Sequence, residues 1–226
     1  MELDPAVEKA LFRAVGHRGP ITREERESIT GLNIRNAENL SRLDGFSSLK
    51  RLVIVGCDPI GSNLFSGLDG LRSLVVEDSG LREISEVGST SLLNFSIPRN
   101  FVEDLAPLLS ISSLLQFDVT GNPLSEYSYR EVIPEMIHNG CRVQASEELE
   151  WKLTLRLHSE GVPISCYESP DGYRLCRPGL ELTDSPQYAH PVISLEDIRK
   201  LLRGDPLMAH EYFDQGDRIP FGSRSD

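Results

Sequence analysis

The chain has 226 residues, of which 39% are hydrophobic and 26% charged, as in ordinary soluble globular proteins. Acidic residues outnumber basic residues by 35 to 23, and the net charge of −12 argues against binding to nucleic acid or to an anionic membrane surface. No apolar run is long enough to span a membrane, and the N-terminal stretch lacks the apolar segment of a secretory signal. We therefore expect a cytoplasmic protein.

Two short helices are predicted at the N-terminus, over residues 1–28. Asp4 followed by Pro5 is typical of a helix start, and Gly16 is typical of a helix end. The inward face of this first helix is expected to carry Leu11, Phe12 and Val15. Residues 22–25 read Thr-Arg-Glu-Glu, which matches a capping box and predicts the second helix. We expect the two helices to cap the repeats that follow.

A motif of apolar residues spaced L-x-x-L-x-L then recurs five times. Its copies start at positions 29, 49, 71, 92 and 114, so the spacing is 20 to 22 residues. The apolar triplets are Ile29, Leu32 and Ile34; Leu49, Leu52 and Ile54; Leu71, Leu74 and Val76; Leu92, Phe95 and Ile97; and Leu114, Phe117 and Val119.

A second column of residues supports this alignment. Eight positions after each start stand small residues, most of them polar: Ala37, Cys57, Ser79, Asn100 and Asn122. In a stacked array such a side chain turns inward and hydrogen-bonds the backbone of the turn, which would otherwise be buried without partners. Only Ala37 does not suit this role.

Over residues 22–143 the pattern resembles the leucine-rich-repeat family, in particular the short 22-residue class shared by internalins and the phosphatase-regulator type. The resemblance implies an α/β solenoid with a parallel sheet on the concave side and short turns or 3₁₀ pieces on the convex side. We assign residues 29–143 to this array. A capping helix is predicted within residues 125–140, and residues 141–143 are expected to form a last edge strand. The inward residues of the capping helix are expected to be Val132, Ile133, Met136 and Ile137. Pro134 either kinks this helix or marks its start.

The remaining chain resembles no family, and we expect residues 144–204 to form a small α+β appendage. Ser146 is expected to cap a helix that ends at Gly161, although the alternation over residues 151–157 also permits a strand. The turn at residues 169–172 predicts a hairpin, and a further helix is expected from Ser194 to about Leu202. The tail, residues 205–226, is either loosely ordered or packed against the body.

The candidate functional surface is the concave face, where side chains between the core positions point outward. Val53, Val55 and Val75 should be neighbours there, and an exposed apolar patch rimmed by charges is typical of a protein interface. Strand propensity alone, or the C-terminal segment folding over the patch, are the alternative explanations. The candidate partner-binding residues are Arg35, Arg51, Val53, Val55, Val75, Glu77, Asp78, Asn94, Arg99, Gln116 and Asp118.

Residues that would carry catalysis or hold a metal are scattered along the chain. The four cysteines show no C-x-x-C spacing and no nearby histidine pair, so we expect packed thiols and no zinc site. His158 and Cys166 can be drawn as a pair, but nothing supplies an orienting group. No glycine-rich loop suits a phosphate. We therefore expect no catalytic site, no metal and no cofactor.

Together these features favour a non-catalytic module that is monomeric when unbound and binds another protein, with a basic face, on its concave side. An inhibitor of the immunity-protein type is the sharper version. One alternative makes the C-terminal segment an active or small-ligand unit, with a polar pocket near Tyr167, Tyr173, His158 or Arg174, and the repeats its scaffold. Another is a self-associating structural protein.

Overall fold

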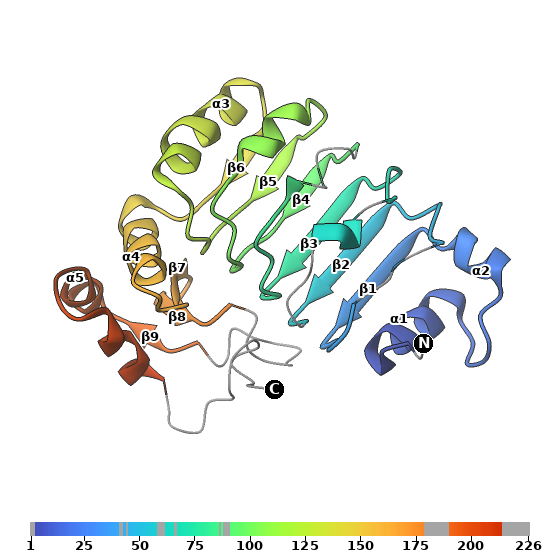
Figure 1. The fold of residues 1–226 in the computed structure, drawn as a ribbon, viewed down its shortest axis with the longest axis horizontal. Coiled ribbons are helices and arrows are strands. Elements are labelled where there is room, and N and C mark those ends of the chain that lie inside the picture. Colours follow the sequence, from blue (N-terminus) through green and yellow to red (C-terminus); the bar gives the residue numbers. More distant parts are fainter. Residues whose placement is uncertain are drawn as a thin grey trace.

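The five repeats and the edge strand after them form one parallel sheet of six strands in chain order, which confirms the predicted solenoid. The computed structural model describes residues 3–40, 43, 45–57, 62–65, 67–85, 87, 91–178 and 190–213, and no helix among them is long and apolar enough to cross a membrane. The strands are β1 (Gly31–Arg35), β2 (Arg51–Val55), β3 (Ser73–Glu77), β4 (Asn94–Ser96), β5 (Gln116–Asp118) and β6 (Arg142–Gln144). The sheet curves into an arc, with helices at both ends (Figure 1).

Equivalent positions of the motif pair across the sheet. Leu32, Leu52 and Leu74 are aligned on neighbouring strands, and Phe95 continues the row to Phe117. All five are at most 3% exposed, because each strand turns this side toward the interior of the solenoid. The rings of Phe95 and Phe117 stack with centroids 5.5 Å apart. On the convex side, two 3₁₀ turns complete the core: η1 (Ser62–Phe65) and η3 (Ala106–Ser110).

The second column forms a hydrogen-bond ladder through the buried turns, as predicted. Asn100 Oδ1 accepts from the backbone N–H groups of Ser79 and Leu81, each at 3.1 Å. Its Nδ2 donates to the carbonyl of Val76 at 2.8 Å and to that of Ile97 at 3.1 Å. The other members act in the same way: Cys57 Sγ accepts from Ala37 N, Ser79 Oγ from Cys57 N, and Asn122 Oδ1 from Val102 N. Each repeat is thus bonded to the next through turns that water cannot reach.

The N-terminal helices α1 (Pro5–Val15) and α2 (Arg23–Ser28) lie at the β1 end of the sheet. Asp4 caps α1 by accepting from Ala6 N at 2.7 Å, and its second oxygen accepts from Glu38 N at 2.8 Å in the turn after β1. One carboxylate therefore starts the helix and fastens it to the first repeat. Leu11 is buried, and the capping box at Thr22 is present.

At the other end of the array, the segment predicted as one capping helix consists of a π turn, η4 (Ser128–Val132), followed by α3 (Ile133–His138). Pro134 lies in the first turn of α3, directly after the π turn, and the helical conformation continues from η4 into α3 without a break, so Pro134 does not mark the start of the helical segment. Met136 is buried, but Ile137 is 54% exposed, and its expected inward position is wrong. The π turn widens the helix and changes the phase that a regular 3.6-residue period would give.

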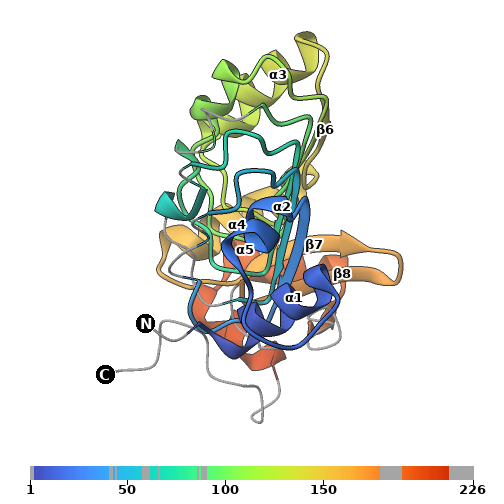
Figure 2. The ribbon, with the colours of Figure 1, turned by 90° about the vertical axis from the view of Figure 1, so that its right-hand side faces the viewer.

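The C-terminal segment has its own small sheet and helices. They are α4 (Glu148–Ser159), β7 (Ser165–Ser169), β8 (Gly172–Cys176), β9 (Val192–Ile193), α5 (Leu195–Arg203) and the 3₁₀ segment η6 (Pro206–Tyr212). The three strands are antiparallel in the order β7-β8-β9. In Figure 2 the hairpin of β7 and β8 projects past the solenoid. Residues 151–157 are helical, so the alternative of a strand there is wrong.

The helix α4 connects the two hydrophobic cores. Trp151 lies in the core of the repeats, whereas Leu153 and Leu157 lie in a second core with β7, β8 and α5. The indole stacks on Tyr129 with centroids 3.9 Å apart, and its N–H donates to the Leu124 carbonyl at 2.8 Å. The C-terminal unit is therefore fixed to the last repeat by an aromatic pair in which Trp151 is fully buried.

The structure tests two further predictions for the C-terminal unit, one on the cap of α4 and one on the tail. Ser146 does not cap α4, because Glu147 is the cap and Ser146 Oγ accepts from Gly121 N at 2.9 Å. The first part of the tail packs against the body, since Phe213 lies in the second core. Residues 179–189 and 214–226 lie outside the described residues.

Replacing Asn100 by alanine should lower the free energy of unfolding by about 2–4 kcal/mol, because several buried backbone groups would lose their partner at once. The matched change Asn94→Ala, on the same repeat but exposed, should cost less than about 0.5 kcal/mol. Urea titration measures both. Equal losses for the two variants would contradict the ladder.

A second prediction concerns His158, which lies at the contact between α4 and the fourth repeat. The centroids of the His158 and Phe101 rings are 5.3 Å apart, and the guanidinium of Arg82 lies over the Phe101 ring. Burial, helped by the charge of Arg82, lowers the pKa of His158 from 6.5 to about 4. The unfolded chain therefore binds a proton that the folded chain does not, and stability is lost as the pH falls below 6.5.

Between pH 7 and pH 5 this histidine should remove about 2 kcal/mol of stability. The variant His158→Gln should lack that part of the pH dependence, as measured by denaturant unfolding at both pH values. If NMR of the folded protein showed the His158 imidazole itself titrating near pH 6.5, this prediction would be contradicted.

Candidate functional site

The outward side chains of the sheet form rows across the concave face. One row runs through Asn94, Gln116 and Arg142, which pair on β4, β5 and β6 and are all exposed. The next row runs from Ser96 to Asp118 and then to the exposed Gln144. The C-terminal half of the concave face is therefore polar and open to solvent.

The expected valine patch is not an exposed surface. Val53 and Val55 are 8% and 2% exposed, and Val75 is only partly exposed. Strand alternation correctly turned these side chains away from the repeat core, but it does not determine whether that face is open to solvent. The prediction that these valines form an exposed apolar patch is therefore wrong.

A polar hollow of about 570 Å³ lies where the C-terminal ends of β3–β6 meet the hairpin of β7 and β8. The repeats line it with Glu77, Ser96, Arg99, Asp118, Thr120 and Gln144, and the hairpin lines it with Tyr167, Glu168, Asp171 and Arg174. A shallower hollow of about 270 Å³ continues across β3–β6 and shares Ser96, Asp118 and Gln144 with it. The two form one concave region, which we call the polar hollow.

Negative charge prevails in the polar hollow. Three arginines line it: Arg174 is paired with Asp171, Arg99 is paired with Glu77, and Arg142 is exposed at the β6 edge. The contact with Arg174 lowers the pKa of Asp171 to about 2. The remaining acids of the hollow are Asp118 and Glu168, and neither forms an ion pair within the described part of the chain. Asp118 is instead positioned by Thr120, whose hydroxyl donates to it at 2.8 Å.

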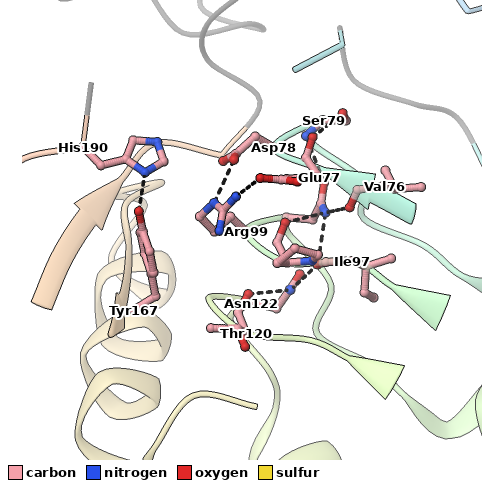
Figure 3. A network of polar contacts seen from close by, with 12 residues as sticks. Val76, Glu77, Asp78, Ser79, Ile97, Arg99, Thr120, Asn122, Tyr167 and His190 are labelled. Atoms are coloured by element: carbon pink, nitrogen blue, oxygen red, sulfur yellow. Dashed lines mark hydrogen bonds and ion pairs between the residues drawn. The ribbon is translucent and has the colours of Figure 1, made fainter. Parts of the chain in front are cut away.

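A buried ion network forms the floor of the hollow (Figure 3). Arg99 is 6% exposed and bonds Glu77 and Asp78, with its Nε 2.8 Å from Asp78 Oδ2. Its guanidinium also lies over the ring of Tyr167, 5.1 Å from the centroid. Tyr167 in turn is hydrogen-bonded to His190 Nδ1 at 2.8 Å. The network therefore joins two turns of the solenoid to the C-terminal sheet.

Arg99 occupies an unusual backbone position. The residue seven places after each motif start is left-handed: φ is 62° at Asn36, 58° at Gly56, 45° at Asp78, 55° at Arg99 and 72° at Gly121. Glycine, asparagine and aspartate tolerate this conformation, whereas an arginine pays about 1 kcal/mol or more. The contacts of its side chain offset that cost. A Cβ at Gly121 would come within 3.1 Å of Arg99 Cγ, so the neighbouring glycine makes room for it.

Burial shifts the pKa of two groups in the network. Desolvation raises the pKa of Asp78 to about 7, and Arg99 opposes that shift. Desolvation, together with Arg99 and Arg174, lowers the pKa of His190 to about 3. The imidazole is therefore neutral at physiological pH. Asp78, Cys176 and His190 come together here as residues that could hold a metal ion.

The structure brings some of the candidate binding residues together and separates others. Glu77, Asn94, Arg99, Gln116 and Asp118 line the polar hollow, whereas Asp78 is buried beneath it. Arg35 lines a different hollow beside α1, and Arg51 is exposed on the N-terminal half of the sheet.

The sequence analysis named Tyr167 and Arg174 as possible neighbours of a polar pocket, and both line the polar hollow, but it did not place the hairpin beside the concave face. The turn of the hairpin was predicted, but only packing between distant segments places Glu168 and Asp171 beside the strands. The drawn pair of His158 and Cys166 does not form, since His158 Nε2 lies 3.2 Å from Ser165 Oγ and burial raises the pKa of the Cys166 thiol. All four cysteines are buried free thiols, as expected.

No protein-family model and no curated protein matches the chain. Among solved structures it is similar to an internalin, InlF, from Listeria monocytogenes, with a TM-score of 0.45 and 16% identity over 67% of this chain and 53% of the other. The similarity to internalin C2 of the same organism has a TM-score of 0.37 and 18% identity, over 64% of this chain and 87% of the other. The chain thus spans about half of InlF. At these values the similarity carries no functional argument, and the fold rests on the parallel sheet and the turn ladder.

Replacing Arg99 by glutamine should lower the free energy of unfolding by about 3–5 kcal/mol, because Glu77 and the buried Asp78 would lose the hydrogen bonds and the positive charge of the guanidinium. Arg142→Gln, which removes an exposed arginine two strands away, should cost less than about 0.5 kcal/mol. Denaturant unfolding at neutral pH compares them. A loss of under 1 kcal/mol for Arg99→Gln would show that the network does not hold the turns.

Proposed function

We propose that the protein is a non-catalytic binding module that recognises a partner protein in the polar hollow, and that a basic side chain of the partner enters it. The observation that carries this proposal is the pair of carboxylates, Asp118 and Glu168, which form no ion pair with the described residues although they line a preformed concave surface. An arginine or lysine from a partner supplies that cation.

Rigidity supports the same function. Asp118 is fixed by Thr120, and the strands on either side of it are bonded through the ladder of turns. A surface held in this way loses little conformational entropy on binding. The net charge of −12 adds a long-range attraction for a basic partner, which accelerates encounter.

The finer form of the proposal is that binding blocks a partner enzyme or toxin, in the manner of an immunity protein. A preformed acidic hollow suits this role because it can cover a basic site without changing shape. The protein is then a monomer that works inside the cell, and the hollow takes one partner molecule. The partner then contacts residues of β4–β6 on one side and of the β7–β8 hairpin on the other.

The double variant Asp118→Asn and Glu168→Gln tests this surface, because it removes two charges while keeping the shape of both side chains. A partner captured from the native host with the wild-type chain should bind this variant at least about tenfold more weakly. The loss of affinity should come mainly from faster dissociation of the complex, and the difference from the wild type should be smaller at high salt. The matched control is Glu103→Gln with Glu135→Gln, two exposed carboxylates outside the hollow.

Calorimetry or surface plasmon resonance with the purified partner measures both variants. Equally weak binding by the control variant would show that the effect comes from overall charge and not from the polar hollow. Unchanged binding by the hollow variant would place the interface elsewhere, and a captured small molecule in place of a protein would favour the C-terminal unit as a ligand site.

A further inference from the structure

Three potential metal ligands meet beneath the polar hollow, each from a different element. Asp78 lies in the turn after β3, Cys176 ends β8, and His190 lies just before β9. One donor atom from each lies within 4.8 Å of the other two. The residues are 3%, 0% and 7% exposed, so the cluster is enclosed.

Asp78 has an oxygen with no partner. Its Oδ2 accepts from Arg99 Nε, but Oδ1 is buried and has no hydrogen-bond partner among the described residues. Figure 3 shows this carboxylate between Arg99 and His190. A buried carboxylate oxygen without a donor is energetically costly. The unsatisfied oxygen therefore points to a ligand beyond the described residues.

His190 is oriented as a metal ligand would be. Its Nδ1 is bonded to the Tyr167 hydroxyl, and the other ring nitrogen faces Asp78 (Figure 3). With Nδ1–H donating to the Tyr167 oxygen, Nε2 carries the lone pair. Such an outer hydrogen bond fixes the tautomer and the ring orientation of metal-binding histidines.

With both carboxylates ionised, the charges of the network do not balance without a cation. Glu77 and Asp78 bring two negative charges, and Arg99 brings one positive charge. A divalent ion that also converts the Cys176 thiol into a thiolate adds a net positive charge and makes the whole network neutral. Buried charges are stable only when they are compensated in this way.

We propose that Asp78, Cys176 and His190 bind one zinc ion. A set of thiolate, imidazole and carboxylate suits zinc and excludes calcium and magnesium, which prefer oxygen ligands alone. Zinc distances of about 2.0–2.3 Å in a tetrahedron place ligand atoms about 3.3–3.8 Å apart, so the three side chains close in by less than about 1 Å. A water molecule takes the fourth position, and the thiol proton is released to the buffer.

The site would clamp the C-terminal sheet to the third repeat. Asp78 belongs to the solenoid, whereas Cys176 and His190 belong to the sheet of β7–β9. Zinc adds a bond between them at the point where Arg99 and Tyr167 already meet. The expectation of no zinc rested on spacing along the chain, and the fold joins residues that are far apart in it.

The test uses the full chain, stripped with a chelator and then titrated with zinc chloride or cobalt chloride. We expect one zinc per chain by plasma mass spectrometry, about one proton released per zinc, and a cobalt–thiolate charge-transfer band. The melting temperature should rise with zinc. A wild-type chain that binds no stoichiometric zinc and shows no thiolate band would overturn the proposal, whatever the variants do.

Cys176→Ser and His190→Gln should weaken zinc binding at least tenfold and abolish the melting shift. The matched control is Cys166→Ser, which changes a second buried cysteine of the same hairpin outside the cluster and should keep the zinc. Circular dichroism verifies that each variant is folded. Folded variants of Cys176 and His190 that bind zinc as the wild type does would also overturn the proposal.

Discussion

Each repeat has to lead its chain from the concave sheet into the convex side through a turn that lies inside the stack, where water cannot satisfy the backbone. Asn100 and Asn122 supply the missing partners, with Ser79 and Cys57 as shorter equivalents toward the N-terminus. Because each side chain bonds the preceding repeat, the turns are held in register as well as satisfied. The shape of the concave face depends on this ladder.

The same turns carry the feature that makes this solenoid particular. In most repeats the left-handed position before the ladder holds glycine, asparagine or aspartate, but the fourth repeat places Arg99 there. Its guanidinium reaches Glu77, Asp78 and the ring of Tyr167, so a local backbone cost is exchanged for contacts that join the repeats to the C-terminal unit. The polar hollow exists because that junction places the hairpin beside β3–β6.

What the sequence could predict follows from the range of the interactions involved. The strands, the ladder and most helix ends depend on periods and caps within a few residues, and they were predicted. Ile137 was misplaced because a π turn breaks the regular period. The burial of Val53 and Val55, the position of Glu168 and the meeting of Cys176 with Asp78 depend on contacts between distant segments, which no local pattern encodes.

Recognition of a partner in the polar hollow is tested most directly by hydrogen exchange of the protein with and without that partner. Backbone amides of β4–β6 and of the hairpin of β7 and β8 should exchange more slowly in the complex, while η3 and α3 on the convex side should be unchanged. Protection confined to the convex side or to α1 and β1, with none in β4–β6 or the hairpin, would contradict it.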